Sequence, residues 1–330
     1  MDSIDLYRHG GRVDDARRLF PAAPEPWLDL STGINPRAWR PPVDVPCDMR
    51  ALPPVSALRG LEEAAAAFFG TDPVRVAAVP GSELALRLLP ALECRLPITA
   101  VMPGYGTHAD VAGRHVTAER LNAHIGERDT LLLANPNNPD GRMLTVGALR
   151  EIMDRQSRAD GWLVVDEAFA DAHAEASIVP LVPEAGRLLV FRSFGKFFGL
   201  AGLRLGFVIG PPVVIARLRG LLGDWPVSAQ AIALGTAAYR DRDWITRTRT
   251  RLMEDAAALD RVLAARGLRA GGACPLFRLV DHADAAGIFN RLAAAGILVR
   301  PFHHQPSWLR FGLPAAEVDL ERLDRALADG

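Results

Sequence analysis

Residues 193–206 read SFGKFFGLAGLRLG and hold the most informative chemistry of the chain. They follow residues 188–191, a short apolar run that is typical of a buried β-strand. Lys196 lies among phenylalanines and glycines, where an amine loses water and becomes more reactive. Ser193 and Arg204 flank it, and arginine suits a dianionic phosphate because its fork donates two hydrogen bonds. The segment predicts a reactive lysine beside a phosphate site; the alternative is a surface lysine near a basic patch.

Short apolar runs alternate with helical patterns on both sides of this segment. The candidate strands are residues 74–79, 98–102, 130–134, 162–165, 188–191 and 205–209, and the candidate helices include residues 83–92 and 145–158. Thr145 is a suitable N-cap for the second helix. This alternation predicts an α/β fold with a mostly parallel sheet that is covered on both faces. Ligands of such sheets bind outside the carboxyl ends of the strands.

The two ends of the chain differ from this central region. Residues 1–48 are rich in proline and lack sustained periodicity, which predicts an N-terminal arm draped over the body. Residues 49–243 are expected to form the large domain, and residues 244–330 a small C-terminal α/β domain. The expected elements of the small domain are a helix over residues 244–265, strands over 276–280, 297–300 and 308–311, and helices over 283–295 and 315–328.

Composition and charge are those of an ordinary globular protein: 49% of the 330 residues are hydrophobic, 23% are charged, and the net charge is −1. Because neither charge dominates, we expect no nucleic-acid and no membrane partner. No apolar run approaches the roughly 18 residues that span a bilayer, and residues 1–9 lack the apolar core of a secretory signal, so we expect a cytoplasmic protein. Cys47, Cys94 and Cys274 are far apart and lack metal-ligand spacing, so we expect no metal site.

Three further segments place polar residues where strands are expected to end. Asp166 closes an apolar run, and a buried acid needs a cationic partner such as a protonated pyridine nitrogen; a helix N-cap or a buried ion pair is the alternative. Asn138 lies in a proline-rich turn, and its amide is able to hydrogen-bond a ligand oxygen. Ser82 and Glu83 open a helix whose first backbone N–H groups bind anions, although a plain N-cap explains the same residues. Each segment is ambiguous alone, and together they predict one binding edge.

The order of these motifs is that of a known family. Gly-Ser-Glu at 81–83, Asn-Pro-Asn-Asn-Pro at 135–139, Asp-Glu-Ala-Phe at 166–169 and Ser-x-x-Lys with Gly-Leu-Arg-x-Gly at 193–206 resemble the motifs of fold-type I pyridoxal-phosphate (PLP) enzymes in the class I and II aminotransferase family. The resemblance covers nearly the whole chain. It implies a large domain with a mostly parallel seven-stranded sheet, a small C-terminal α/β domain, PLP as the cofactor, and a homodimer.

The resemblance also implies roles for individual residues. Lys196 is the catalytic residue and carries PLP as a Schiff base, Asp166 pairs with the pyridine nitrogen, and Asn138 contacts the ring oxygen. Tyr105 stacks on the ring. The residues implied at the cofactor phosphate are Ser82, Ser193 and Arg204, and the backbone N–H of Glu83, at the start of the expected helix, is expected to join them. Arg310 matches the arginine that clamps the substrate α-carboxylate. The other residues expected to bind substrate are His9, Gly10, Gly33, Asn35 and Arg300.

Within the family, the chain resembles the threonine-phosphate decarboxylases of cobalamin biosynthesis more than the histidinol-phosphate aminotransferases. The segments that carry this likeness are residues 8–11 (RHGG), 27–36 (WLDLSTGINP) and 193–198 (SFGKFF). It implies decarboxylation of a phosphorylated amino acid, L-threonine O-3-phosphate, to (R)-1-amino-2-propanol O-2-phosphate. A PLP-dependent aminotransferase of the histidinol-phosphate type is the alternative. A binding or regulatory protein of the same fold is a second rival, which the retention of Lys196, Asp166 and Arg310 together disfavours.

Three residues depart from the family pattern. Phe169 stands where many aminotransferases have a tyrosine that bonds the cofactor's ring oxygen. Leu52 replaces a tyrosine that in many relatives reaches the PLP phosphate of the neighbouring subunit. Gly195 replaces the serine or threonine that often precedes the lysine. These departures count against the aminotransferase alternative more than against PLP binding.

Overall fold

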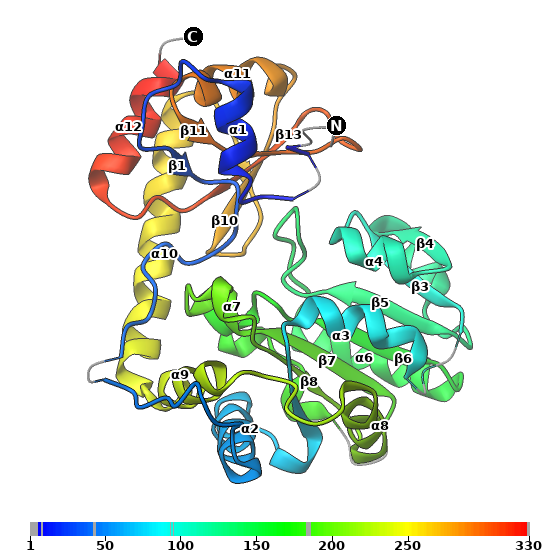
Figure 1. Ribbon diagram of the computed structural model, residues 1–330. Coiled ribbons are helices and arrows are strands. Elements are labelled where there is room, and N and C mark those ends of the chain that lie inside the picture. Colours follow the sequence, from blue (N-terminus) through cyan, green and yellow to red (C-terminus); the bar gives the residue numbers. More distant parts are fainter. Residues whose placement is uncertain are drawn as a thin grey trace. The chain divides into compact units, whose positions relative to one another are not determined.

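The computed structural model of the chain describes residues 6–7, 9–41, 44–92, 94, 96–182 and 186–328. It forms two compact units, which Figure 1 shows coloured along the sequence. The sheet unit consists of residues 38–138 and 142–248. The terminal unit consists of residues 1–37, 139–141 and 249–330. The domain boundaries expected after residues 48 and 243 remain a prediction.

The sheet unit is built on a seven-stranded sheet with the strand order β2-β8-β7-β6-β5-β3-β4. Its strands are β2 Val76–Val79, β3 Ile98–Met102, β4 Arg114–Thr117, β5 Thr130–Ala134, β6 Trp162–Asp166, β7 Leu188–Ser193 and β8 Gly206–Ile209. Neighbouring strands from β4 to β7 in this order are parallel, and β8 runs antiparallel to both β2 and β7. The expected mostly parallel seven-stranded sheet is therefore confirmed.

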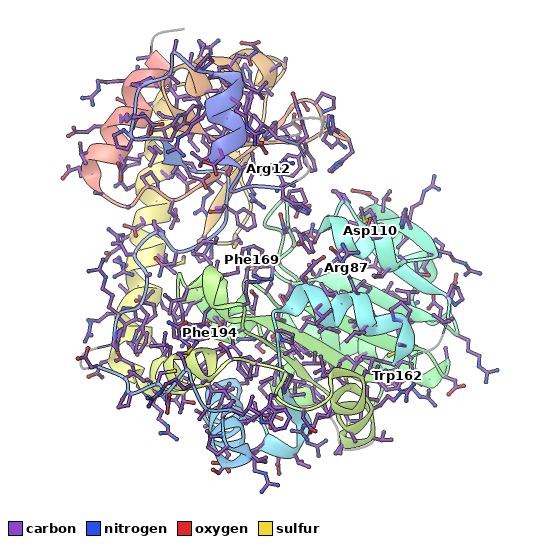
Figure 2. The ribbon with its side chains drawn as sticks, in the orientation of Figure 1. Arg12, Arg87, Asp110, Trp162, Phe169 and Phe194 are labelled. Carbon is purple, nitrogen blue, oxygen red and sulfur yellow. The ribbon has the colours of Figure 1, made fainter. Side chains whose placement is uncertain are left out.

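The central strands are inaccessible to solvent, as a sheet covered on both faces requires. Every residue of β6 is buried, and four of its five side chains are apolar. Its first residue, Trp162, lies at the other end of the sheet from Phe169, which follows the carboxyl end of β6 (Figure 2). Asp166, at the carboxyl end of β6, is therefore the only charged residue of this strand.

Two details of the sheet differ from the sequence-based expectation. β4 was not predicted, because only Val116 among its four residues is buried and an edge strand of this kind leaves no apolar run. β2 begins two residues later than expected, because Pro73–Arg75 form a 3-10 turn. Asp72 caps this turn by accepting the N–H of Val74 at 2.9 Å.

Helices pack on the sheet through apolar side chains. They are α2 Val55–Phe69, α3 Ser82–Leu88, α4 Gly106–Val111, α5 Leu121–His124, α6 Val146–Arg158, α7 Phe194–Phe197, α8 Pro212–Leu222 and α9 Ala229–Arg240. Leu86 of α3 and Ile215 of α8 share one buried cluster with Val164 of β6. Thr145 is the N-cap of α6, as expected, and its Oγ1 accepts the N–H of Ala148 at 3.2 Å. Among the described residues, no helix is both long and apolar enough to cross a membrane.

The terminal unit carries a four-stranded antiparallel sheet with the order β12-β13-β10-β9 and a parallel pair, β1-β11. Its elements are α1 Val13–Leu19, β1 Leu28–Asp29, β9 Ala270–Gly271, β10 Phe277–Asp281, α11 Ala285–Ala294, β11 Ile297–Leu298, β12 Arg300–Pro301, β13 Trp308–Gly312 and α12 Glu317–Ala328. The long helix α10, Arg242–Ala265, runs through residues of both units. β1 belongs to the predicted arm and pairs with β11, so this part of the arm is tied into the unit by backbone hydrogen bonds.

Candidate active site

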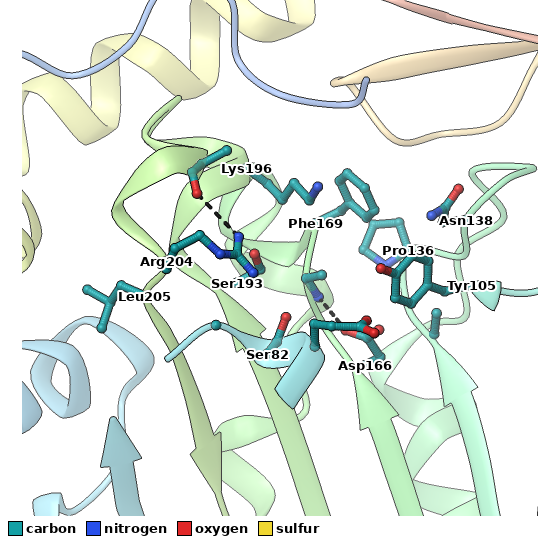
Figure 3. Close-up of a pocket in the computed structure, with 16 residues that line it drawn as sticks. Ser82, Tyr105, Pro136, Asn138, Asp166, Phe169, Ser193, Lys196, Arg204 and Leu205 are labelled. Atoms are coloured by element: carbon teal, nitrogen blue, oxygen red, sulfur yellow. Dashed lines mark hydrogen bonds between the residues drawn. The ribbon is translucent and has the colours of Figure 1, made fainter. Parts of the chain in front are cut away.

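One cavity of the sheet unit lies where its parallel strands end (Figure 3). It is lined by Gly81, Ser82, Glu83, Tyr105, Ala134, Pro136, Asn138, Asp166, Ala168, Phe169, Ser193, Gly195, Lys196, Ala201, Arg204 and Leu205. All the residues predicted to hold the cofactor are among them. The structure brings these side chains together from distant parts of the sequence, and their individual roles remain a prediction.

The topology of the sheet explains why these segments meet. β6 and β7 are parallel neighbours, so their last residues, Asp166 and Ser193, lie at one edge. β8 is antiparallel and begins at Gly206, which pairs with Ser193. Arg204 just precedes β8, and Ser82 just follows β2, which pairs with β8 antiparallel. Both therefore reach the same edge as the carboxyl ends of the parallel strands.

Arg204 is fixed beside the start of α3. Its φ is 53°, a left-handed backbone that is uncommon for a residue other than glycine, and its Nη1 donates to the carbonyl of Ala201 at 3.3 Å. A Cβ on Gly81 would lie 2.8 Å from Arg204 Nη2, and a Cβ on Gly206 would lie 2.5 Å from the backbone nitrogen of Ser82. The two glycines thus permit a close approach of guanidinium and backbone. The Arg204 guanidinium, the hydroxyls of Ser82 and Ser193 and the first N–H groups of α3 together offer the donors that suit a phosphate group.

Lys196 lies on α7, the single helical turn that follows β7. Phe194 and Phe198 on either side of it are fully buried, and their rings stack with centroids 4.4 Å apart. Because these rings anchor the turn in the core, the half-buried Lys196 extends into the cavity, where its Nζ lies 5.8 Å from the ring centroid of Phe169 (Figure 3). The phenylalanines that made this segment conspicuous in the sequence are therefore the supports of the turn.

Lys196 is also the only lysine among the 38 lysine and arginine residues of the chain. Arginine performs every other cationic task in this protein, but a guanidinium stays protonated and does not add to a carbonyl carbon. The nucleophilic role predicted for Lys196 is one that arginine could not fill, and this role remains a prediction. The sequence contains this signal, and it supports Lys196 independently of any motif.

Asp166 is buried and has two polar contacts. Its Oδ1 accepts the N–H of Ala168 at 3.0 Å, and its Oδ2 lies 3.0 Å from Nε2 of His108. His108 is fully buried on α4, and its Nδ1 has no hydrogen-bond partner among the residues that the structure describes. Sequence reasoning missed His108, because a histidine in a short helix carries no signal of its own. The contact with His108 orients the carboxylate of Asp166, a residue that lines the cavity.

Tyr105 forms another wall of the cavity. Burial, and then the nearby Glu83 carboxylate, raise the pKa of Tyr105 to about 12, so the phenol stays neutral. The edge of its ring meets the His108 ring, with centroids 5.9 Å apart and planes at 89°. A neutral ring in this position offers a flat surface to an aromatic ligand.

The departures from the family pattern have a structural counterpart. A Cβ on Gly195 would lie 2.6 Å from the Cα of Ala201, so no larger residue fits without a backbone shift. Phe169 is 5% exposed and presents its ring to Lys196. Leu52 is 65% exposed and does not line the cavity.

The residues predicted to bind substrate belong to the terminal unit. Arg310 of β13 is 4% exposed, and its Nη2 donates to the carbonyl of Ser31 at 2.8 Å. A Cβ on Gly10 would lie 2.2 Å from the same carbonyl oxygen, so Gly10 and Arg310 approach one segment of the arm. The other predicted residues are the exposed His9, the buried Gly33, Asn35, whose Oδ1 accepts the N–H of Arg37, and Arg300 of β12. Arg8, quoted with His9 in the sequence motif, lies outside the described residues.

Arg300 and Arg310 are register partners across β12 and β13. Burial, and then the charge of Arg300, lower the pKa of Arg310 to about 9. Like charges directly opposite each other on neighbouring strands are unfavourable unless an anion compensates them. An anion-binding role for this pair in the terminal unit remains a prediction.

The lining of the cavity fits PLP in each of its chemical parts. Lys196 supplies an amine for the aldehyde, Asp166 a buried carboxylate for the pyridine nitrogen, and Arg204 the cation of a phosphate cradle. Tyr105 supplies a ring face. Within the described residues, no cluster of three or more histidine, cysteine, aspartate or glutamate side chains has the geometry of a metal site.

Comparison with known proteins points in the same direction. The threonine-phosphate decarboxylases of Sinorhizobium sp and Pseudomonas aeruginosa are 40% and 38% identical to this chain, over 97% and 98% of it and 97% of each relative. The solved structures of a histidinol-phosphate aminotransferase from Clostridium acetobutylicum and of L-threonine-O-3-phosphate decarboxylase from Porphyromonas gingivalis share the fold, with TM-scores of 0.77 and 0.75. Each is 18% identical and covers 92% of this chain and 98% of its own. The family model for aminotransferase class I and II matches residues 48–329, and the chain therefore belongs to that family.

Proposed function

We propose that this protein is a PLP-dependent decarboxylase that converts L-threonine O-3-phosphate into (R)-1-amino-2-propanol O-2-phosphate and carbon dioxide in cobalamin biosynthesis. The observation that carries the proposal is the convergence of Lys196, Asp166 and Arg204 on one cavity. The names of the two relatives at about 40% identity over nearly the full length support the choice of reaction.

The cavity residues divide the task of holding the cofactor. Lys196 would attach it through Nζ, Arg204 with Ser82 and Ser193 would bind its phosphate, and Tyr105 would cover its ring. When bound, PLP supplies the electron sink for cleavage at the substrate α-carbon. Asp166 would keep the pyridine nitrogen protonated, and its own position is maintained by the Ala168 N–H and by His108.

The substrate is expected to carry two anionic groups, because two arginines lie side by side in the terminal unit. Arg310 would bind the α-carboxylate and Arg300, with His9, the phosphate ester. Decarboxylation breaks the bond between the α-carbon and the carboxyl carbon, carbon dioxide leaves, and a proton takes its place on the α-carbon. Lys196 is the group that would deliver this proton, since it lines the cavity and its amine can carry a proton.

The test is a direct assay with PLP-loaded protein and L-threonine O-3-phosphate. We expect carbon dioxide and the aminopropanol phosphate in equal amounts, without any 2-oxo acid acceptor. The absence of carbon dioxide, together with formation of pyridoxamine phosphate from an amino donor and its reversal by 2-oxoglutarate, would assign the protein to the histidinol-phosphate type of aminotransferase instead.

We further propose that the enzyme acts as a homodimer in the cytoplasm. Large apolar side chains are exposed on the sheet unit: Met49 at 66%, Leu52 at 65%, Val55 at 64% and Trp225 at 52%. Trp225 has a left-handed φ of 53°, which is an unfavourable backbone conformation for a residue other than glycine. A contact between this exposed indole ring and a partner subunit would offset that unfavourable free energy. Cys47 and Cys274 are free thiols, which suits a reducing compartment. Sedimentation velocity tests the dimer, and a fully active monomer would contradict it.

A further inference from the structure

We propose that Trp39 and Asp241 are positioning residues for Lys196, and that together they hold the turn that carries this lysine. The inference rests on the proposed function in one respect, namely that PLP attaches to Lys196. Neither residue lines the cavity, so an effect of either one on the cofactor would act through the turn. The contacts that connect them to the turn all lie within the sheet unit.

Trp39 is bound to the turn through its backbone. Its N–H donates to the carbonyl of Phe198 at 2.8 Å, and Phe198 is the residue at which α7 ends. The last carbonyl groups of a helix have no partner within the helix, so an outside donor fixes the end of the turn. Trp39 is 2% exposed, and its indole N–H therefore needs a partner inside the protein.

Asp241 supplies that partner from the junction of two helices. It is the residue between α9 and α10, and Figure 1 shows the chain turning from the one helix into the other. Its Oδ2 accepts the indole N–H of Trp39 at 2.9 Å, and its Oδ1 accepts the backbone N–H of Trp244 at 3.1 Å. The second bond is that of an N-cap, because Trp244 is the third residue of α10. One carboxylate therefore fixes the Trp39 side chain and the start of α10.

Trp244 contacts the same turn through its ring. It stacks on Phe198 with centroids 5.5 Å apart and planes at 12°, and it meets Phe197 edge to face at 5.5 Å. Phe197 and Phe198 directly follow Lys196. Because α7 is only four residues long, it has little rigidity of its own and depends on such contacts. Asp241 is thus connected to the end of the Lys196 turn by two routes, the backbone bond from Trp39 and the ring stack from Trp244.

A plain N-cap of α10 with a buried tryptophan beside it is the competing explanation. Asp241→Ser separates the two explanations, because serine caps a helix about as well as aspartate but its single, shorter side-chain oxygen cannot also reach the indole. Trp39→Phe removes the indole donor and leaves the cap untouched. Trp162→Phe is the matched control, since Trp162 is also a buried tryptophan of the sheet unit and begins β6 at the end of the sheet away from the cavity.

The first measurement uses apoprotein and needs no cofactor. Lys196 is the only lysine, so protein labelled with ¹³C at the lysine Cε gives one signal that needs no assignment. Trp39→Phe and Asp241→Ser should each shift or broaden this signal. The double variant should do no more than either single variant, because both remove the same hydrogen bond. A wild-type signal in either single variant would overturn the proposal, as would an equal change in Trp162→Phe.

The second measurement compares PLP with pyridoxamine phosphate, which shares the ring and the phosphate of PLP but has no aldehyde and cannot attach to Lys196. In Trp39→Phe and Asp241→Ser we expect PLP binding to weaken by about tenfold, the contribution of one hydrogen bond to a charged group, and pyridoxamine phosphate binding to stay unchanged. Unchanged PLP binding, or an equal loss for both ligands, would overturn the proposal. If the wild-type protein binds neither ligand, the proposed function fails, while the lysine signal of the apoprotein still decides whether Trp39 and Asp241 position Lys196.

Discussion

Replacing Arg192 by methionine is expected to destabilise the protein strongly and in a pH-dependent way. Arg192 is a buried residue of β7 itself and is 3% exposed. Its Nη1 donates to Glu167 at 2.5 Å and to Ser177 at 3.2 Å, and its Nη2 donates to Asp171. Its guanidinium also lies 4.7 Å from the centroid of Phe69. The substitution keeps an apolar stem in place but leaves two buried carboxylates without their guanidinium.

The size of the effect follows from the burial of these partners. Glu167 is 0% and Asp171 1% exposed, so neither carboxylate gains water when the cation is removed. Breaking a buried ion pair by removing one partner costs about 3–5 kcal/mol. The same cluster with its charges removed together, Arg192→Met with Glu167→Gln and Asp171→Asn, should recover most of this loss.

The pH dependence has a definite sign. Burial raises the pKa of Glu167 above its ordinary value of 4.5, although Arg192 opposes the shift. A group with a raised pKa in the folded state contributes stability below the pKa of the unfolded chain and loses it as pH rises through the folded pKa. Without Arg192 that folded pKa rises further, so the variant should lose more stability at about pH 8 than at about pH 5.

Urea unfolding at a fixed protein concentration measures both effects. Arg128→Met is the matched control, because Arg128 makes an exposed pair with Asp160 whose loss should cost less than about 1 kcal/mol. A loss below about 1 kcal/mol for Arg192→Met, or an equal loss at both pH values, would refute the reasoning.

Three further predictions concern single residues of the sheet unit. Lys196→Ala should abolish the visible absorbance of the bound cofactor and turnover, and full turnover in this variant would contradict the central assignment. Gly195→Ser should weaken PLP binding by about tenfold or more in equilibrium dialysis, because its Cβ would meet the backbone of Ala201, whereas Gly202→Ser, with no atom within 4 Å of its Cβ, should bind normally. Tyr239→Phe removes a buried hydroxyl that has no hydrogen-bond partner among the described residues, so thermal unfolding should show unchanged or slightly higher stability, and a loss above about 2 kcal/mol would contradict this.

The sequence was sufficient for the sheet and for the convergence of the site because both depend on local signals. A short apolar run such as residues 162–165 is typical of a strand in a sheet that helices cover on both faces. Asp166 and Ser193 end such runs, and parallel pairing then brings them to one edge. Six of the seven strands, and the edge where the predicted site residues meet, therefore followed from local signals, whereas the number seven followed only from the resemblance to the family.

What the sequence could not supply are contacts made by side chains across elements. His108 and Glu83 are ordinary residues of short helices, and only the packing of α4 against α3 and β6 gives them their partners. The exposed strand β4 was missed for the opposite reason, since an edge strand with one buried residue has no periodic pattern. The intolerance of Gly195 to a side chain is likewise invisible until Ala201 is placed beside it.

Because Lys196 is the only lysine of the chain, cleavage at this residue can report whether the cofactor is attached to it. A protease that cleaves only after lysine has a single target bond here, between Lys196 and Phe197, and would divide the denatured chain into two fragments of residues 1–196 and 197–330. Borohydride reduction of the PLP-loaded protein would fix the cofactor to that amine and block the cut. The ratio of intact to divided chain on a gel would then count occupied active sites directly, without a substrate and without any knowledge of the reaction.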